Sequence, residues 1–182
     1  MFFRSLVLMT TWINILLAQS SSSTEDVLQA KAGYLCNFAN FVEWPPHSFA
    51  WPESPIEICV FGKDAIDGPL QRAIQDKNAG ERKLALEHPH EIRQARTCQI
   101  LFISNSEKAS AKQILQSLSG LSVLTVSDMD GFRSMGGTIN FVMEGDHVRF
   151  EVDLTQAQHA GLKLSSRLLS AARMVISPQG GR

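Results

Sequence analysis

Apolar residues recur at every third or fourth position between residues 27 and 42. This spacing places them on one face of an amphipathic helix. Ser23-Thr-Glu-Asp26 has the spacing of a capping box and predicts where the helix starts, and Trp44-Pro45-Pro46 predicts where it ends. The apolar face consists of Val27, Ala30, Tyr34, Leu35, Phe38, Phe41 and Val42.

Short apolar runs alternate with helical segments between residues 56 and 127. The runs Ile56–Phe61 and Ile100–Ile103 are rich in β-branched and large apolar residues, which is typical of central strands covered on both faces. Such an alternation predicts parallel strands joined by helical crossovers. The expected strands are 56–62, 83–87, 99–104 and 122–127, and the expected helices are 65–76, 91–96 and 107–118.

Beyond Asp130-Gly131 the pattern changes to an alternation of apolar and polar residues. Residues 137–143 and 147–153 alternate about a Glu-Gly-Asp turn, which predicts an antiparallel hairpin closing one edge of the sheet. A last apolar helix follows Leu154-Thr155 and is stopped by Pro178. We therefore expect an α/β fold: a single three-layer Rossmann-like domain with a mostly parallel sheet, an antiparallel C-terminal hairpin and the N-terminal helix packed on it.

The N-terminal segment has the features of an export signal. Met1-Phe-Phe-Arg4 is a positively charged start, residues 6–17 are mostly apolar, and Ala18-Gln-Ser20 fits a small-x-small cleavage site. The apolar stretch is too short to cross a hydrocarbon core of roughly 30 Å as a helix. We predict a signal peptide at 1–20, cleaved near Ser20, a periplasmic protein, and one domain at 21–182 with an ordered core at about 24–177. An uncleaved membrane anchor is the alternative.

Composition and motifs argue against several functional classes. Without residues 1–20 the chain keeps 16 basic and 18 acidic residues, a net charge of −2, and the two signs are interspersed, so we expect no nucleic-acid partner. The run 62–68 after the first strand matches neither glycine-rich phosphate-binding motif, and no G-x-S-x-G motif is present. His88-Pro-His90 lacks partners at a recurrent metal-binding spacing. We expect no catalysis, no cofactor and no metal ion.

Cys59 lies in the first expected strand, and Cys98 lies just before the third. These strands are neighbours in the doubly wound order 2-1-3-4-5, so in an oxidising compartment the two cysteines are predicted to form a structural disulfide. Closing a loop of about 40 residues contributes roughly 4 kcal/mol on the chain-entropy model. Two buried free thiols are the alternative. We interpret Cys36 as a small buried hydrophobic residue, with pairing between chains as the alternative.

Polar residues are concentrated near the C-terminal end of the chain. Arg149, Glu151 and Asp153 alternate along the hairpin, and Ser166 and Arg167 follow in the expected last helix. Guanidinium groups bind carboxylates and phosphates through two hydrogen bonds, and arginine is enriched in protein interfaces. We interpret these residues as an anion-binding or partner-binding surface centred on Arg149 and Arg167. A solvated face with surface ion pairs is the alternative.

Two tryptophans provide a second candidate interface. Trp44 and Trp51 lie beside Pro45-Pro46 and Pro52, which predicts a loop in which both rings are partly exposed. Exposed aromatic residues often anchor protein interfaces. We therefore include Trp44 in the candidate partner surface.

Several stretches of the chain resemble the YfiR family of bacterial periplasmic proteins (DUF4154). The similarity covers nearly all of residues 21–182 in the expected order, which makes it more specific than any single motif. The matching stretches are KAGYLCNF at 31–38, FVEWP at 41–45, ICVFG at 58–62, CQILFIS at 98–104, VLTVSD at 123–128, GGTI at 136–139, VRFEVD at 148–153 and LKLSSRLL at 162–169.

The resemblance implies a regulatory protein without catalytic residues. YfiR-like proteins bind the periplasmic sensor domain of an inner-membrane diguanylate cyclase and repress it, so that redox or envelope stress raises cyclic di-GMP and biofilm formation. The family's stabilising disulfide falls on Cys59 and Cys98. A second disulfide found in some members has no counterpart, because no cysteine follows Cys98. Members can also self-associate, so a homodimer is a further expectation.

A periplasmic small-molecule binding domain is the alternative function. In open α/β sheets, ligands bind in the crevice at the carboxyl ends of the strands. In this chain the crevice would lie near Gly62-Lys63, Ser104-Asn105 and Ser127-Asp128. Such a ligand could also bias the binding of a protein partner.

Overall fold

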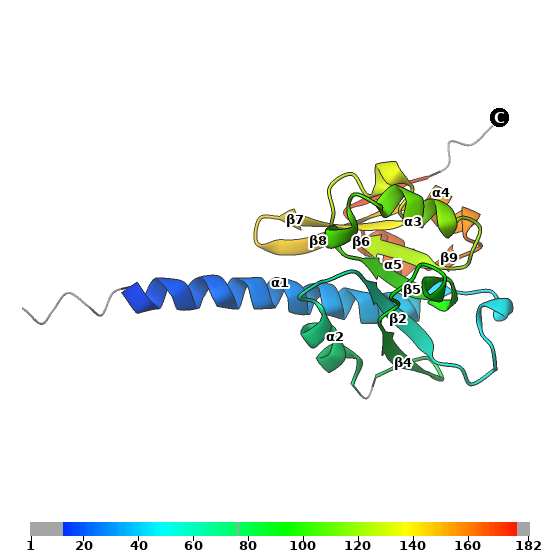
Figure 1. Cartoon of the computed structure of the whole chain (residues 1–182), viewed down its shortest axis with the longest axis horizontal. Coiled ribbons are helices and arrows are strands. Elements are labelled where there is room, and N and C mark those ends of the chain that lie inside the picture. Colours follow the sequence, from blue (N-terminus) through cyan, green and yellow to red (C-terminus); the bar gives the residue numbers. More distant parts are fainter. Residues whose placement is uncertain (1–12, 76, 178–182) are drawn as a thin grey trace, which may run out of the picture.

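The computed structural model of the protein describes residues 13–75 and 77–177 (Figure 1). An eight-stranded sheet forms its centre, in the order β10-β8-β7-β6-β5-β2-β4-β3. The central strands β4, β2, β5, β6 and β7 run parallel, which confirms the predicted α/β class and the neighbouring positions of the two cysteine-bearing segments. The strands are β2 (Ile56–Phe61), β3 (Asn78–Ala79), β4 (Arg82–Glu87), β5 (Ile100–Ile103), β6 (Leu124–Ser127), β7 (Ile139–Glu144), β8 (His147–Asp153) and β10 (Met174–Ile176).

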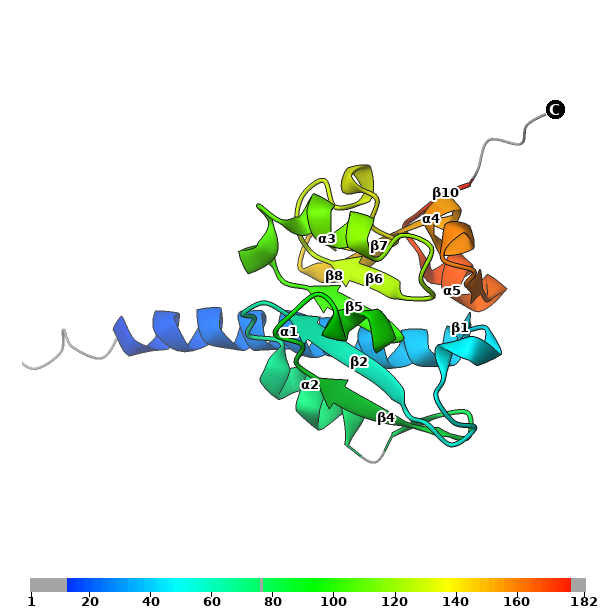
Figure 2. The ribbon, with the colours of Figure 1, turned by 45° about the vertical axis from the view of Figure 1, so that its right-hand side comes forward.

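Helices cover both faces of the sheet, so the domain has three layers. One face packs against α1 (Ile13–Phe41), α2 (Asp67–Ile74) and α5 (Ser166–Ala171), and the opposite face packs against α3 (Ala111–Ser117). Figure 2 shows α1 and α3 on opposite sides of β5 and β6. Side chains alternate along β5, so Ile100 and Phe102 join the core on the α1 side while Leu101 and Ile103 join the core on the α3 side.

The first helix is longer than the sequence pattern predicts. It begins at Ile13 rather than at Ser23, and its N-terminal part extends beyond the sheet (Figure 1). A capping box marks the start of a helix only where the residues before it do not favour helix. Here Leu16-Leu-Ala-Gln19 favour it, so the helix starts earlier. Within the predicted signal peptide, residues 13–20 belong to α1 and residues 1–12 lie outside the described residues. None of the described helices has a stretch long and apolar enough to cross a membrane.

The predicted last helix is wrong, because residues 154–176 form four short elements. These are α4 (Leu154–His159), β9 (Lys163–Leu164), α5 and β10. Gly161 adopts a φ of +69°, which ends α4. The Ser165 side chain accepts a hydrogen bond from Leu168 N and starts α5. Pro178, the predicted helix end, lies outside the described residues. The β7–β8 hairpin is present, but β10 adds parallel to β8 and forms the sheet edge in its place.

The remaining elements are short. β1 (Val42–Glu43) pairs with β9 in a two-stranded antiparallel ribbon beside the main sheet. Single 3-10 turns occur at η1 (Pro46–Ser48), η2 (Gln94–Thr97), η3 (Asn105–Glu107) and η4 (Arg133–Met135). The predicted helix 91–96 is reduced to η2, because the chain has room for only one turn before Cys98 leads it into β5.

Candidate functional site

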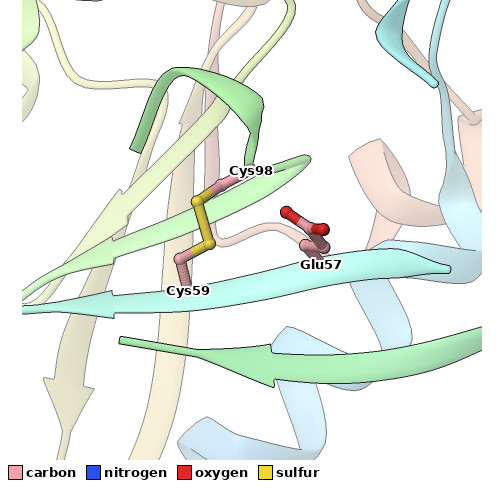
Figure 3. A group of neighbouring side chains, drawn as sticks. All are labelled: Glu57, Cys59 and Cys98. Carbon is pink, nitrogen blue, oxygen red and sulfur yellow. A yellow bond between two sulfur atoms is a disulfide. The ribbon is translucent and has the colours of Figure 1, made fainter. Parts of the chain in front are cut away.

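The predicted disulfide is present and is buried within the sheet. Cys59 lies in β2 and Cys98 lies two residues before the start of the adjacent β5, and their Cα atoms are 6.0 Å apart (Figure 3). Both cysteines are almost fully buried and join the apolar cluster on the α3 side of the sheet. The bond therefore ties the start of one central strand to the middle of its neighbour. Cys36 is a free, buried thiol in α1, as predicted, and burial raises its pKa.

Gln99, which the sequence reasoning missed, organises the chain around this disulfide. Its side-chain amide is buried and donates hydrogen bonds to Ser48 O at 2.7 Å and to Thr97 O at 3.1 Å, while its Oε1 accepts one from Glu57 N at 2.8 Å. The loop before β2 is thereby held against the segment that enters β5. A polar residue between a cysteine and a run of apolar strand residues was the available signal.

The structure corrects the prediction for Trp44, which is buried rather than exposed. Its side chain is 7% exposed, and its indole N–H donates a hydrogen bond to Gln99 O at 3.2 Å. A tryptophan in a proline-rich loop can still pack into the core when its N–H finds a partner. Trp51, in contrast, is 71% exposed, so only the second of the two tryptophans is accessible to a partner.

Glu57 lies beside the disulfide on the same side of β2 (Figure 3). One of its carboxylate oxygens and the two sulfur atoms all lie within 4.8 Å of one another. Among the described residues, no hydrogen bond or ion pair reaches this carboxylate. Partial burial raises the pKa of Glu57, and the negative charge of Glu87 raises it further. Glu57 and Cys98 both line a cavity of about 400 Å³.

Glu151, predicted to lie on a partner surface, is a buried ion-pair residue instead. It is 7% exposed, and Arg133 holds its Oε2 through Nη2 at 2.7 Å and Nε at 2.9 Å. Arg173 reaches the other oxygen at 3.4 Å. Arg173 and Arg149 also pair with Glu144 at 3.5 and 3.4 Å, respectively. This charge network fastens η4 and the start of β10 to the hairpin.

The predicted centre of the partner surface is divided between two faces of the sheet. Arg149 shares the side of β8 on which Glu151 lies, and the intervening Phe150 packs towards α1. Arg167 and Ser166 are exposed on α5, which contacts α1 on that other face. Sequence proximity could not reveal this separation, because the predicted helix broke into short elements.

Exposed apolar residues lie next to Arg149, on the outermost strand. Met174 is 45% exposed and Ile176 is 38% exposed, and they pair in register with Glu151 and Asp153 of β8. We call Arg149, Arg173, Met174 and Ile176 the hairpin-edge surface. Apolar side chains surrounded by arginines are typical of protein-binding surfaces.

The loops at the carboxyl ends of the strands contact one another. Ser104 Oγ donates a hydrogen bond to Lys63 O at 2.6 Å, and Ser127 Oγ donates one to Ile103 O at 2.7 Å. Gly62 adopts a φ of +92°, and a Cβ at this position would lie 2.6 Å from Ser106 Oγ. These contacts occupy the Ser104 and Ser127 hydroxyls, two of the polar groups that the small-molecule hypothesis assigned to a ligand.

The structure combines a disulfide-bonded α/β domain with a charged, partly apolar sheet edge, and such edges are common in protein-binding surfaces. The family model described as DUF4154, YfiR/HmsC-like, matches residues 28–173. The chain therefore belongs to the YfiR/HmsC-like family, whose members are periplasmic regulators in cyclic di-GMP signalling rather than enzymes.

A solved structure shares the fold. The crystal structure of a conserved domain protein from Vibrio cholerae O1 biovar El Tor str. N16961 superposes with a TM-score of 0.52 at 8% sequence identity. The match covers 66% of this chain and 55% of that chain, so this chain spans only about half the length of the neighbour. At this identity the likeness concerns the fold alone.

Proposed function

We propose that this protein is a periplasmic repressor of a membrane diguanylate cyclase. It binds the periplasmic sensor domain of the cyclase and lowers cyclic di-GMP signalling and biofilm formation, and redox or envelope stress relieves the repression. The observation that carries this proposal is membership of the YfiR/HmsC-like family over residues 28–173. The intramolecular disulfide supports an oxidising compartment such as the periplasm. A homodimer and a small ligand remain predictions.

The hairpin-edge surface is the proposed contact with the cyclase. Arg149 and Arg173 supply guanidinium groups, and Met174 and Ile176 supply exposed apolar area beside them. Among the described residues, β10 is the last strand of the sheet and no strand pairs with its outer side, so a further strand could add there. Arg167 lies on the other face and is assigned no part in this contact.

The disulfide acts on this contact through the stability of the fold. β10 and β2 are separated in the sheet by β8, β7, β6 and β5, so reduction does not alter the proposed surface directly. Loss of the bond lowers the fraction of folded, binding-competent protein, and apparent affinity falls in proportion to that fraction. Repression then weakens when the compartment becomes reducing.

A pull-down from solubilised inner membranes tests the proposal. The oxidised protein is expected to capture a diguanylate cyclase, identified by mass spectrometry, and the reduced protein is expected to capture less. Met174→Asp places a charge in the hairpin-edge surface and is expected to abolish capture, whereas Trp51→Ser, at an exposed site outside that surface, is the matched control. Capture of no cyclase by the oxidised protein contradicts the proposed function. Equal capture by Met174→Asp contradicts the proposed surface only.

A further inference from the structure

We propose that reduction of the disulfide converts Glu57, Cys59 and Cys98 into a zinc-binding site. In the reduced protein, two thiolates and one carboxylate bind the ion, and water completes the coordination. This site would operate whether or not the protein represses a cyclase. It is a second state of the same three residues, because the sulfur atoms cannot bind a metal while they are bonded to each other.

The three ligand atoms already lie close together. Glu57 and Cys59 are two residues apart on β2, so their side chains leave the strand on the same side, and Cys98 comes from the segment beside them (Figure 3). The ligand atoms lie within 4.8 Å of one another. Zinc binds sulfur at about 2.3 Å and carboxylate oxygen at about 2.0–2.2 Å, so tetrahedral ligands are separated by about 3.5–3.8 Å. On reduction the two sulfur atoms separate from their bonded positions towards this spacing, and a rotation of the Glu57 side chain brings its oxygen to it.

The Glu57 carboxylate has no other partner among the described residues. This distinguishes it from Glu151, whose two oxygens are both held by arginines. After reduction, three groups that can each carry a negative charge would lie together and repel one another. A divalent cation offsets this repulsion, and thiolate-containing sites of this kind select zinc over magnesium or calcium.

The cavity beside the disulfide gives access to the site. It has a volume of about 400 Å³ and is lined by Glu57 and Cys98, but not by Cys59. Because Cys98 lines this cavity, we place the attack of a dithiol reductant's thiolate at Cys98 Sγ, with Cys59 leaving as a thiolate. The second thiol of the reductant then releases Cys98 and closes the reductant's own disulfide, so two electrons pass to the protein. Zinc displaces any remaining thiol protons to solvent, and water from the cavity fills the open position.

The metal would take over the mechanical role of the disulfide. Zinc held by β2 and by Cys98 in the segment before β5 joins the same two segments that the sulfur–sulfur bond joins. Reduction alone would then loosen the fold, whereas reduction in the presence of zinc would restore the connection. The stability of the reduced protein should consequently depend on zinc.

Zinc titration of the purified full-length protein tests the proposal. The protein is reduced with a phosphine, freed of the reductant under nitrogen, and titrated with zinc against a chromophoric chelator. The reduced protein is expected to bind one zinc ion and to gain thermal stability, and the oxidised protein is expected to do neither. Cobalt in place of zinc should produce thiolate-to-metal absorption in the reduced protein only.

Two glutamate variants separate a built site from two free thiols. Glu57→Gln retains both cysteines and is expected to weaken zinc binding at least about tenfold, the lower limit seen when a residue that merely supports a metal ligand is lost. Glu87→Gln is the matched control, because Glu87 lies beside Cys59 in the register of β4 but outside the ligand cluster. Failure of the reduced protein to bind zinc overturns the proposal. Equal affinities of the two variants, or unchanged affinity in urea-unfolded protein, overturn it as well.

Discussion

Two carboxylates on the central sheet differ sharply in their surroundings. Glu151 is buried at the hairpin end of the sheet, and both of its oxygens are held by arginines. Glu57 is partly buried at the disulfide end, and no described residue pairs with its carboxylate. A buried carboxylate that is paired with arginines contributes to the stability of the fold, whereas an unpaired one reduces it. An unpaired carboxylate is therefore a candidate for a functional role. We therefore assign Glu151 a structural role and Glu57 the ligand role proposed above.

The largest effect is expected from removing the disulfide. Cys98→Ala should lower the free energy of unfolding by roughly 4 kcal/mol, because the unfolded chain regains the freedom of a loop closed over 39 residues. Denaturant unfolding followed by circular dichroism measures this change. Cys36→Ala is the control because it leaves the disulfide intact. An unchanged unfolding midpoint for Cys98→Ala would show that the bond contributes nothing to the folded state.

A smaller loss is expected at the other end of the sheet. Glu151→Gln should cost about 2 kcal/mol, less than the loss of a fully buried pair, because Arg133 and Arg173 can turn partly towards solvent. Urea unfolding of Glu151→Gln, of Arg133→Gln and of the double variant gives the coupling energy of the pair. If the two losses simply add, Glu151 and Arg133 act independently and the assignment of Glu151 to architecture is wrong.

Gln99 tests the disulfide end of the sheet, with an expected loss of stability similar to that at Glu151. Gln99→Ala should cost about 1–3 kcal/mol, because the partly buried Ser48 O and Glu57 N lose their partners. The loop before β2 should loosen as well, which quenching of Trp44 fluorescence by acrylamide would report. Trp51 is exposed already, so it and Trp12 must be replaced by phenylalanine in both proteins. Unchanged quenching would mean that the Trp44 hydrogen bond to the backbone holds the loop without the glutamine.

The sequence predicted the central architecture well because apolar periodicity reports burial directly. The strands around Cys59 and Cys98, their neighbouring positions and their disulfide could all be inferred from apolar runs and a common strand order. The last part of the chain was mispredicted because Leu164, Leu168 and Val175 are compatible with a single helical face. The conformation of Gly161 and the Ser165 cap decide otherwise.

The candidate surface was harder to predict than the fold, because exposure depends on tertiary contacts. Trp44 lies in a proline-rich loop and was expected to be exposed, yet its indole N–H is bonded to Gln99 O. Glu151 lies on an alternating strand and was expected to face solvent, yet two arginines from other segments pair with it. The position of Glu57 beside the disulfide depends equally on strand register. An acidic residue two positions before a strand cysteine was the only local signal.

The smallest effect is a pH-dependent stabilisation by Glu57→Gln. Because the pKa of Glu57 is raised in the folded state, the stability it confers is fully present below the ordinary glutamate pKa and is lost as the pH rises through the raised pKa. Glutamine does not ionise, so the variant should be more stable than the wild-type oxidised protein at pH 7, by roughly 0.5 kcal/mol or less because solvent screens the half-exposed carboxylate. The gain should vanish below about pH 4.

Urea unfolding at both pH values measures this gain. Glu87→Gln should give a smaller gain of the same sign, because it removes only the charge of Glu87 and leaves Glu57 partly buried. A loss of stability at pH 7 would show that Glu57 has a stabilising partner and would remove the contrast with Glu151.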